Sequence, residues 1–231
     1  MHRNPKDGNG EVLLVDKPAG WTSHDVVQKL RGLLHLRKVG HAGTLDPRAT
    51  GLLIVVTGPM TRKLSLLMEL DKEYRGKMVI GARTPSFDAE TEVVERGDCS
   101  SVTEGALRSL LREYVGEISQ TPPLYSAVKY KGLPLYKYAR RGVHVERPQR
   151  RVTISALDLL SFAPPEVEFR AVCSKGTYIR SLVDDIGQRL GCGAFLKSLV
   201  RTRVGTYSLD DALTIPELEA LCTRPNSVER R

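Results

Sequence analysis

The sequence predicts an α+β fold with a mixed, mainly antiparallel central sheet flanked by helices. Two observations lead to this class. Apolar runs typical of strands alternate irregularly with segments of helical periodicity, whereas a doubly wound fold requires regular alternation. The 231 residues, 41% of them hydrophobic, are enough to bury a large core. We therefore expect one domain over residues 1–231.

The N-terminal part is predicted to begin with a strand and a helix. Residues 11–16, EVLLVD, form the strand, and residues 17–20, KPAG, form a turn. Thr22 or Ser23 can cap the helix that follows. The inward face of this helix consists of apolar residues at helical spacing, namely Val26, Val27, Leu30, Leu33 and Leu34.

Residues 52–57, LLIVVT, form a continuous apolar run of β-branched character. Such a run is typical of a strand that is buried on both faces. A short helix at 60–70 and a strand at about 73–81 follow. Thr103 can cap the next helix, which Gly116 ends. The apolar stripe of that helix consists of Ala106, Leu107, Leu110, Leu111 and Tyr114.

Residues 121–149 contain paired prolines, several glycines and few core-forming side chains. This composition predicts a projecting insertion. The remaining elements are expected in the order of strands at 152–160 and 166–173, a helix at 178–190, a strand near 199–207 and a short helical tail over 208–231.

The formal net charge is +8 and the pI is about 9.4, so a polyanionic partner is plausible. The excess is local, because between Lys129 and Arg151 only Glu146 is acidic. Tyrosines lie among the cations of this segment, and cations with aromatic rings suit a phosphate backbone and unstacked bases. A solvated basic hairpin or helix explains the charge but leaves the tyrosines less well explained. The cations are Lys129, Lys131, Lys137, Arg140, Arg141, Arg147, Arg150 and Arg151.

The segment 40–51, GHAGTLDPRATG, is predicted to be a loop that fixes Asp46. Gly40 and Gly43 can take backbone angles that other residues avoid, and Pro47 favours an extended conformation at the residue before it. An ordinary Asp-Pro turn is the alternative, and for this segment alone it is the more frequent case. His41 lies in the same loop, where histidine is more often a hydrogen-bonded turn residue than a functional one.

Several classes of function lack their sequence signals. No GxGxxG follows a predicted strand, and no GxxxxGK[ST] or GxSxG motif occurs. The four cysteines are widely spaced and form no CxxC pair. We therefore expect no cofactor and no metal. Because no apolar run approaches the length that spans a bilayer and no leader is evident, we expect a cytoplasmic protein without membrane contact.

Arg180 lies in the first turn of a predicted helix, where the helix dipole disfavours a cation. A cation there favours an acidic partner, and Asp46 is a candidate. Such a pair would keep the carboxylate ionised and nucleophilic at neutral pH. An arginine that faces solvent explains the position equally well. Tyr74 and Tyr178 are most simply half-buried aromatic residues.

Five segments, taken in order, resemble the TruB family of tRNA pseudouridine synthases. They are VDKPAGWTSHDVV, KVGHAGTLDPRATGLL, DKEYRG, PPLYSAVKYKGLPLYKYARRG and CSKGTYIRSLVDDIGQRLGCGA. The similarity runs from Glu11 to Tyr207. It implies the pseudouridine synthase fold and isomerisation of the T-loop uridine of tRNA, position 55 in standard numbering, to pseudouridine. The T-arm of tRNA would then be the partner, and neither metal nor redox cofactor would be needed.

The resemblance also implies roles for individual residues. Asp46 would be the catalytic aspartate, Arg180 its ion-pair partner, and Tyr74 would stack on the target base. Tyr178 and Leu199 would line the pocket, Lys17 would support the site, and His41 would enter the T-loop where the nucleotide flips out. The insertion 121–149 would grip RNA through Lys129, Lys131, Lys137, Arg140 and Arg141.

Two other functions share these features. A non-catalytic tRNA-folding or RNA-binding module would use the fold and the basic surface without chemistry. A hydrolase would use Asp46 to cleave the glycosidic bond and would release free uracil. For the isomerase itself, Asp46 can add to C6 of the base, attack the ribose, or promote elimination to a glycal. The tail after Asp211 is short, so we expect no C-terminal PUA domain, and we expect a monomer.

Overall fold

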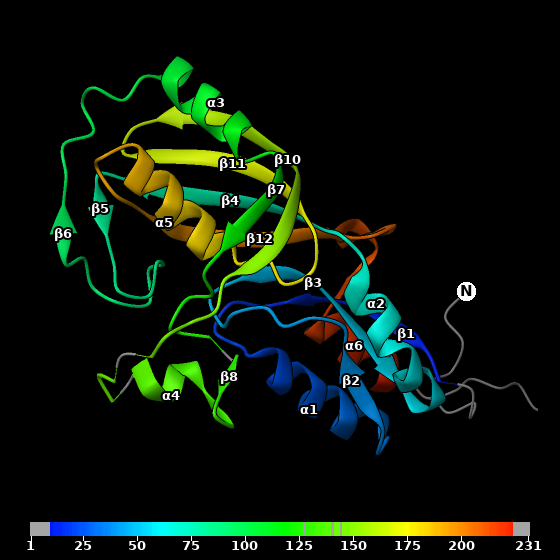
Figure 1. Ribbon diagram of the computed structural model, residues 1–231. Coiled ribbons are helices and arrows are strands. Elements are labelled where there is room, and N and C mark those ends of the chain that lie inside the picture. Colours follow the sequence, from blue (N-terminus) through cyan, green and yellow to red (C-terminus); the bar gives the residue numbers. More distant parts are fainter. Residues whose placement is uncertain (1–9, 127, 140, 144, 224–231) are drawn as a thin grey trace, which may run out of the picture. The chain divides into compact units, whose positions relative to one another are not determined.

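The computed structural model describes residues 10–126, 128–139, 141–143 and 145–223 (Figure 1). By its internal contacts the chain divides into two compact units. The first unit contains the residues up to Leu70 and those from Val200 onward, and the second is Asp71–Leu199. Strand β12, Ala194–Val204, passes through this boundary.

The first unit is built on a mixed sheet with β3 at its centre. β1 pairs with β3 in antiparallel register, with Val15 opposite Leu53, and β2 is antiparallel to β3 as well. The pairs β1–β14 and β3–β12 are parallel. The strands of this unit, besides the end of β12, are β1 (Val12–Lys17), β2 (Val39–His41), β3 (Thr50–Thr57), β13 (Tyr207–Ser208) and β14 (Leu213–Thr214).

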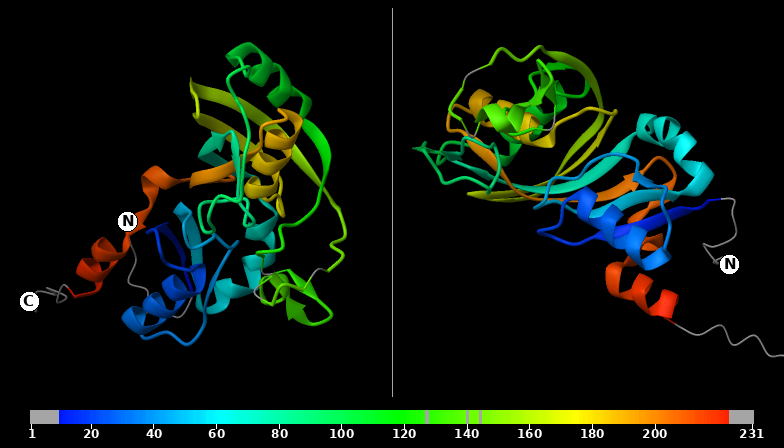
Figure 2. Two further views of the ribbon diagram at one scale, coloured as in Figure 1. Left: turned by 90° about the vertical axis from the view of Figure 1, so that its left-hand side faces the viewer. Right: turned by 90° about the horizontal axis from the view of Figure 1, so that it is seen from below.

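Strand β3 is buried on both faces, which confirms the prediction for residues 52–57. Because side chains alternate along a strand, Leu53 and Val55 pack toward α1 (Ser23–Leu34) and α6 (Ile215–Thr223). Leu52, Ile54 and Val56 pack toward the opposite layer. That layer consists of the 3₁₀-helix η1 (Gly58–Lys63) and the helix α2 (Leu64–Glu69), and Figure 2 shows α1 and α2 on opposite sides of the strands.

The ends of the helices in this unit follow from local chemistry. The Asp25 amide donates to the Thr22 hydroxyl (3.0 Å) and the Thr22 amide donates to the Asp25 carboxylate (2.8 Å), which forms a capping box and confirms Thr22 as the cap of α1. Of the helical tail predicted over 208–231, the described residues form the 3₁₀-helix η2 (Leu209–Asp211) and, after β14, the helix α6 from Ile215. Pro216 then lies in the first turn of α6, where proline is tolerated.

The second unit has an antiparallel sheet in the strand order β4–β11–β10–β7. Together with the sheet of the first unit, this confirms the predicted mixed, mainly antiparallel class. β10 and β11 form a long hairpin, and α3 packs against β10, where Arg108 donates to the Leu159 carbonyl (3.2 Å) (Figure 1). The elements are β4 (Lys72–Ile80), β5 (Ala82–Arg83), β6 (Glu95–Arg96), α3 (Glu104–Glu113), β7 (Gly116–Gln120), β10 (Arg150–Ala163), β11 (Glu166–Cys173) and α5 (Ile179–Arg189).

One burial assignment and two boundaries differ from the prediction. The cap of α3 at Thr103 is confirmed, but Ala106 is exposed and does not belong to the buried stripe. Gly116 begins β7, which the sequence analysis read only as the end of a helix. The strand expected near 199–207 is β12, which begins at Ala194 and ends at Val204, before a turn that leads into β13.

Candidate active site

Asp46 lies in a turn between β2 and β3 in the first unit. The amide of Ala49 donates to the Asp46 carbonyl (3.1 Å), with Pro47 at the second position of the turn. Gly43 has φ = 109°, a left-handed conformation that favours glycine, as predicted. Gly40 does not belong to the left-handed residues. A Cβ there would lie 2.8 Å from a methyl carbon of Leu64, so a side chain at this position would require that leucine to shift.

Hydrogen bonds from the α1 region hold this turn on both sides of Asp46. The Leu45 amide donates to the Ser23 hydroxyl (2.8 Å), and that hydroxyl lies 3.3 Å from the Leu45 carbonyl. The amide of Gly20 donates to the Pro47 carbonyl (2.8 Å). The backbone before and after Asp46 is therefore fixed, as expected for a residue that must be held in place.

Lys17 lies at the end of β1 and is 0% exposed. Its ammonium donates to the carbonyls of Trp21 (2.6 Å), Pro18 (2.9 Å) and Pro47 (3.2 Å). The pKa of Lys17 is lowered to about 8, chiefly by burial; the negative charge of Asp46 opposes this shift, and the positive charge of Arg201 adds to it. Lys17 is thus a buried cation under the turn that carries Asp46.

Arg201 is a second buried cation at this turn, and sequence analysis did not find it. The side chain lies on β12 and is 1% exposed. Its guanidinium donates to the carbonyls of Leu52 (2.7 Å), Gly43 (3.1 Å) and Thr44 (3.5 Å). Arg201 therefore connects the residues before Asp46 to the start of β3.

The close pairing of β3 with β12 explains the glycine at the end of the loop. Gly51 has φ = 95° and lies opposite Arg201 in the parallel register. A Cβ at this position would lie 2.4 Å from the Arg201 carbonyl oxygen. Only glycine permits this approach of the two backbones.

His41 is the last residue of β2, opposite Val55, and not a residue of the loop as predicted. Burial lowers the pKa of His41, and the charge of Arg201 lowers it further, so the imidazole is neutral at pH 7. Its Nδ1 is buried and has no hydrogen-bond partner among the residues that the structure describes.

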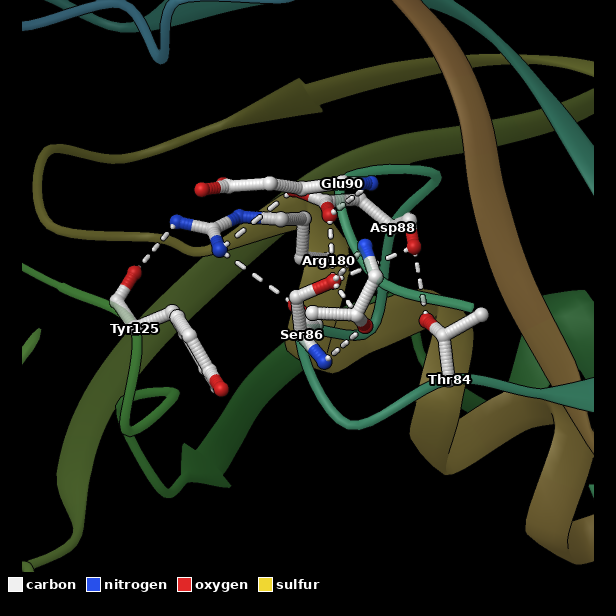
Figure 3. A network of polar contacts seen from close by, with 7 residues as sticks. Thr84, Ser86, Asp88, Glu90, Tyr125 and Arg180 are labelled. Atoms are coloured by element: carbon white, nitrogen blue, oxygen red, sulfur yellow. Dashed lines mark hydrogen bonds and ion pairs between the residues drawn. The ribbon is translucent and has the colours of Figure 1, made fainter. Parts of the chain in front are cut away.

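Arg180 lies in the first turn of α5 in the second unit and is 4% exposed (Figure 3). The solvent-facing alternative is therefore wrong. Its guanidinium lies 3.5 Å from the Asp88 carboxylate and donates to the carbonyls of Ser86 (3.3 Å) and Tyr125 (3.0 Å). Within this unit, Asp88 is thus an acidic partner of Arg180, which the sequence did not indicate. Asp46 belongs to the other unit, and its pairing with Arg180 stays a prediction.

Asp88 is itself held by a buried polar network, which Figure 3 shows. Its carboxylate accepts hydrogen bonds from the Ser86 hydroxyl (2.6 Å) and the Glu90 amide (2.9 Å), and its carbonyl accepts one from the Thr84 hydroxyl (2.7 Å). Phe87, between Ser86 and Asp88, has φ = 63°, a costly conformation for a bulky residue. No sequence signal marked Asp88, because an aspartate in a polar loop is common.

The other predicted pocket residues of the second unit are also buried or half-buried. Tyr74 lies on β4 opposite Ala171 and is 8% exposed. Leu199, on β12, is 8% exposed. Tyr178 is half-buried and occupies the N-cap position of α5. Their contact with a substrate base stays a prediction.

The insertion 121–149 forms a β8–β9 hairpin followed by α4, green in Figure 1. Tyr130 and Tyr138 pack edge to face with ring centroids 5.9 Å apart, so these tyrosines contribute to the packing of the insertion. The bounds are β8 (Lys129–Tyr130), β9 (Leu133–Pro134) and α4 (Leu135–Ala139). The predicted RNA-binding cations Lys129, Lys131, Lys137 and Arg141 are exposed, and Arg140 lies outside the described residues.

Within the described ranges, no group of three or more His, Cys, Asp or Glu side chains is placed to hold a metal ion. No helix in that part of the chain has the length and hydropathy needed to cross a membrane.

Comparisons with known proteins give a consistent result. The TruB family pseudouridylate synthase N-terminal domain matches residues 31–179, and the tRNA pseudouridylate synthase B C-terminal domain matches residues 180–230. A tRNA pseudouridine synthase B of Opitutus terrae is 49% identical over 91% of this chain and 87% of the relative. A protein of the same name from Burkholderia pseudomallei is 50% identical over 95% of this chain and 72% of the relative.

Solved structures agree in fold. A chain in the crystal structure of a Cbf5–Nop10–Gar1 complex matches with a TM-score of 0.73 and 34% identity over 92% of this chain, and the match spans 54% of that chain. An archaeal box H/ACA sRNP Nop10–Cbf5 complex matches with a TM-score of 0.69 and 30% identity. The fold and the matches define a pseudouridylate synthase. Within this class, the chain belongs to the TruB family.

Proposed function

We propose that this enzyme converts uridine 55 in the T-loop of tRNA to pseudouridine. The proposal rests on membership of the TruB family and on relatives named tRNA pseudouridine synthase B. In this isomerisation the bond between N1 and C1′ breaks, a bond between C5 and C1′ forms, and the C5 proton is replaced by one at N1. Atoms and electrons balance without a redox partner, so the protein supplies only binding, orientation and acid–base groups.

We propose Asp46 as the essential carboxylate, because hydrogen bonds from several elements of the first unit hold the backbone of its turn. Backbone, hydroxyl, ammonium and guanidinium donors fix the residues on both sides of it. A fixed carboxylate loses little freedom when substrate binds, which favours the transition state. Arg180, held by Asp88, would provide the positive charge that keeps Asp46 ionised.

The remaining residues would bind the RNA. Tyr74 would stack on the flipped base, with Tyr178 and Leu199 beside it, and the neutral His41 would occupy the place that the base leaves in the T-loop. The exposed lysines of the insertion would contact phosphates. Because these residues come from both units, the proposal takes residues 1–231 as one catalytic domain.

The test uses the purified chain and a T-arm stem-loop RNA with tritium at C5 of its uridines. We expect tritium release and one pseudouridine, at position 55, and a stem-loop with cytidine at that position should release none. Free uracil as the product would identify a hydrolase instead. Tight binding without tritium release would identify an RNA-binding module, and either result would contradict the proposal.

A further inference from the structure

The side chain of Gln120 forms a reciprocal pair with the backbone of Tyr178. Gln120 is the last residue of β7, immediately before the basic insertion, and is 2% exposed. Its amide nitrogen donates to the Tyr178 carbonyl (3.0 Å), and the Tyr178 amide donates to the side-chain oxygen of Gln120 (2.7 Å). The carboxamide thus makes the same two bonds that a neighbouring strand would make.

Two further hydrogen bonds join the first residues of the insertion to α5. The Ser181 hydroxyl donates to the Thr121 carbonyl (2.9 Å). The Arg180 guanidinium donates to the Tyr125 carbonyl (3.0 Å), as Figure 3 shows. Residues 120–125 and 178–181 therefore form one hydrogen-bonded joint, and the residues proposed for the pocket, Tyr178 and Arg180, lie within it.

Tyr178 needs this external support because of its position. It is the N-cap of α5, with an extended backbone (φ −101°, ψ 106°), and its side chain makes no capping hydrogen bond. An N-cap is usually Ser, Thr, Asp or Asn, whose side chain fixes the helix start. A tyrosine cannot do so, and Gln120 fixes the backbone from another strand instead.

We propose that Gln120 is a positioning residue for pseudouridine formation. By fixing the backbone of Tyr178, it holds the start of α5 in register with the insertion that grips the RNA. This inference rests on the proposed roles of Tyr178 and Arg180. The exposed lysines of the insertion lie on β8, in the turn after it and on α4, outside residues 120–125 of the joint, so loss of Gln120 slows the chemical step and leaves RNA affinity nearly unchanged.

The pair requires one donor and one acceptor at the same place, which gives a specific test. An ionised Gln120→Glu carboxylate accepts from the Tyr178 amide but repels the Tyr178 carbonyl. A protonated carboxyl restores both bonds. Burial and the facing carbonyl both favour the neutral acid, so the variant titrates above the usual range of glutamate. A defect caused by general loss of stability does not follow this titration.

The experiment measures kcat and the Kd for T-arm RNA in the wild type, Gln120→Met and Gln120→Glu between pH 5.5 and 8.5. We expect Gln120→Met to lower kcat about tenfold or more, which corresponds to roughly 1.4 kcal/mol, with Kd within about threefold. The ratio of Gln120→Glu to wild-type kcat should rise at least about threefold from pH 8.5 to pH 5.5.

Two matched variants serve as controls. Gln188→Met removes a glutamine from the same helix whose amide donates to Asp184 (2.6 Å) and not to the joint, and it should leave kcat unchanged. Leu107→Ala, in the core of α3, destabilises the same unit without touching the joint. It should lower the melting temperature and leave kcat unchanged at a temperature where it is folded.

The outcomes separate the inference from the proposed function. A wild type that is inactive on T-arm RNA would overturn the proposed function itself. If the wild type is active, the positioning role would be overturned by full kcat in Gln120→Met, or by weaker RNA binding in that variant with unchanged kcat. It would also be overturned if the ratio of Gln120→Glu to wild-type kcat did not change with pH. An equal fall in kcat in folded Leu107→Ala would overturn it as well. If Gln120→Met does not fold, the pH dependence of Gln120→Glu decides.

Discussion

Two buried cations at the Asp46 turn, Lys17 and Arg201, donate to backbone carbonyls. A buried charge costs several kcal/mol unless its hydrogen bonds are made, and these two side chains each make three. Three of these six bonds go to residues that flank Asp46, namely Pro47 from Lys17 and Gly43 and Thr44 from Arg201. We infer that the chain tolerates the cost because the two cations fix the position of this carboxylate.

The variant Arg201→Lys tests whether the buried guanidinium fixes the position of Asp46. The lysine keeps the charge but cannot reach three carbonyls with one ammonium in the guanidinium geometry. We expect a loss of roughly 2–4 kcal/mol in the free energy of unfolding, because buried carbonyls lose donors. We also expect kcat to fall about tenfold or more with little change in RNA affinity. Urea unfolding and single-turnover tritium release measure the two effects.

The matched control is Arg203→Lys, which changes an exposed arginine on the same strand. It should leave stability and kcat near wild type. Equal behaviour of the two variants would show that Arg201 does not hold the turn.

The lowered pKa of Lys17 predicts that the free energy of unfolding depends on pH. Its pKa is about 8 in the folded chain and near 10.5 when unfolded. Between these values the unfolded state binds more protons, so the free energy of unfolding rises with pH. Relative to Lys17→Met, the wild type should gain up to about 3 kcal/mol from pH 8 to 10.5. Urea unfolding across this range measures the gain, with Lys38→Met, an exposed lysine just before β2, as the control. A constant difference between wild type and Lys17→Met would contradict the account.

The residue-scale features that sequence missed share one physical cause. Asp46 and Lys17 lie in short sequence motifs that contain glycine, proline and charged residues, and such motifs can be recognised from the sequence alone. Asp88, Arg201 and Gln120 act through partners 58 to 158 residues away, and no local pattern encodes such contacts. Only the folded backbone brings these groups together.

At the scale of elements, the basic hairpin β8–β9 with α4 presents its lysines to solvent, while its two packed tyrosines form its own small core. Lys131 also lies over the Tyr130 ring, with its ammonium 5.4 Å from the ring centroid, and exposed lysines of this kind suit phosphate contacts. We therefore expect the hairpin to determine RNA affinity and its salt dependence, and the joint at Gln120 to position Tyr178.

Replacing Lys129, Lys131 and Lys137 together by Gln should weaken T-arm RNA binding and flatten its salt dependence. The loss of three phosphate contacts reduces the steepness of the plot of log K against log salt by about two. The turnover of bound RNA should stay near wild type, because the pocket is intact. Filter binding at several salt concentrations measures the slope.

The control is Lys77→Gln with Lys197→Gln, which removes two cations outside the insertion, the half-buried Lys77 and the exposed Lys197, that pair with Glu166. Its slope should match that of the wild type. An unchanged slope in the triple variant would place the RNA contacts elsewhere.

Helices and strands could be predicted where neighbouring residues in the sequence determine their bounds. Thr22 and Thr103 cap helices with regular apolar spacing, and LLIVVT could only be a strand buried on both faces. Prediction failed where tertiary pairing decides. β12 starts before its expected position, and β7 follows a helix directly, because their partners in the sheet extend them.

At the scale of the whole molecule, the residues proposed for catalysis are divided between the two units. The turn with Asp46 belongs to the first, and the Arg180 network to the second. Strand β12 passes through the boundary and carries the proposed pocket residue Leu199 two positions before Arg201. The TruB family match likewise covers nearly the whole chain. We infer that both units are needed for activity.

The central claim is that Asp46 performs the chemistry and the rest of the chain positions it. Asp46→Asn removes the charge and keeps the size, so the turn should be retained. We predict no tritium release from C5-labelled T-arm RNA and no pseudouridine, with a Kd within about tenfold of wild type, or roughly 1.4 kcal/mol. Tritium release by Asp46→Asn at a rate near that of the wild type would contradict the account.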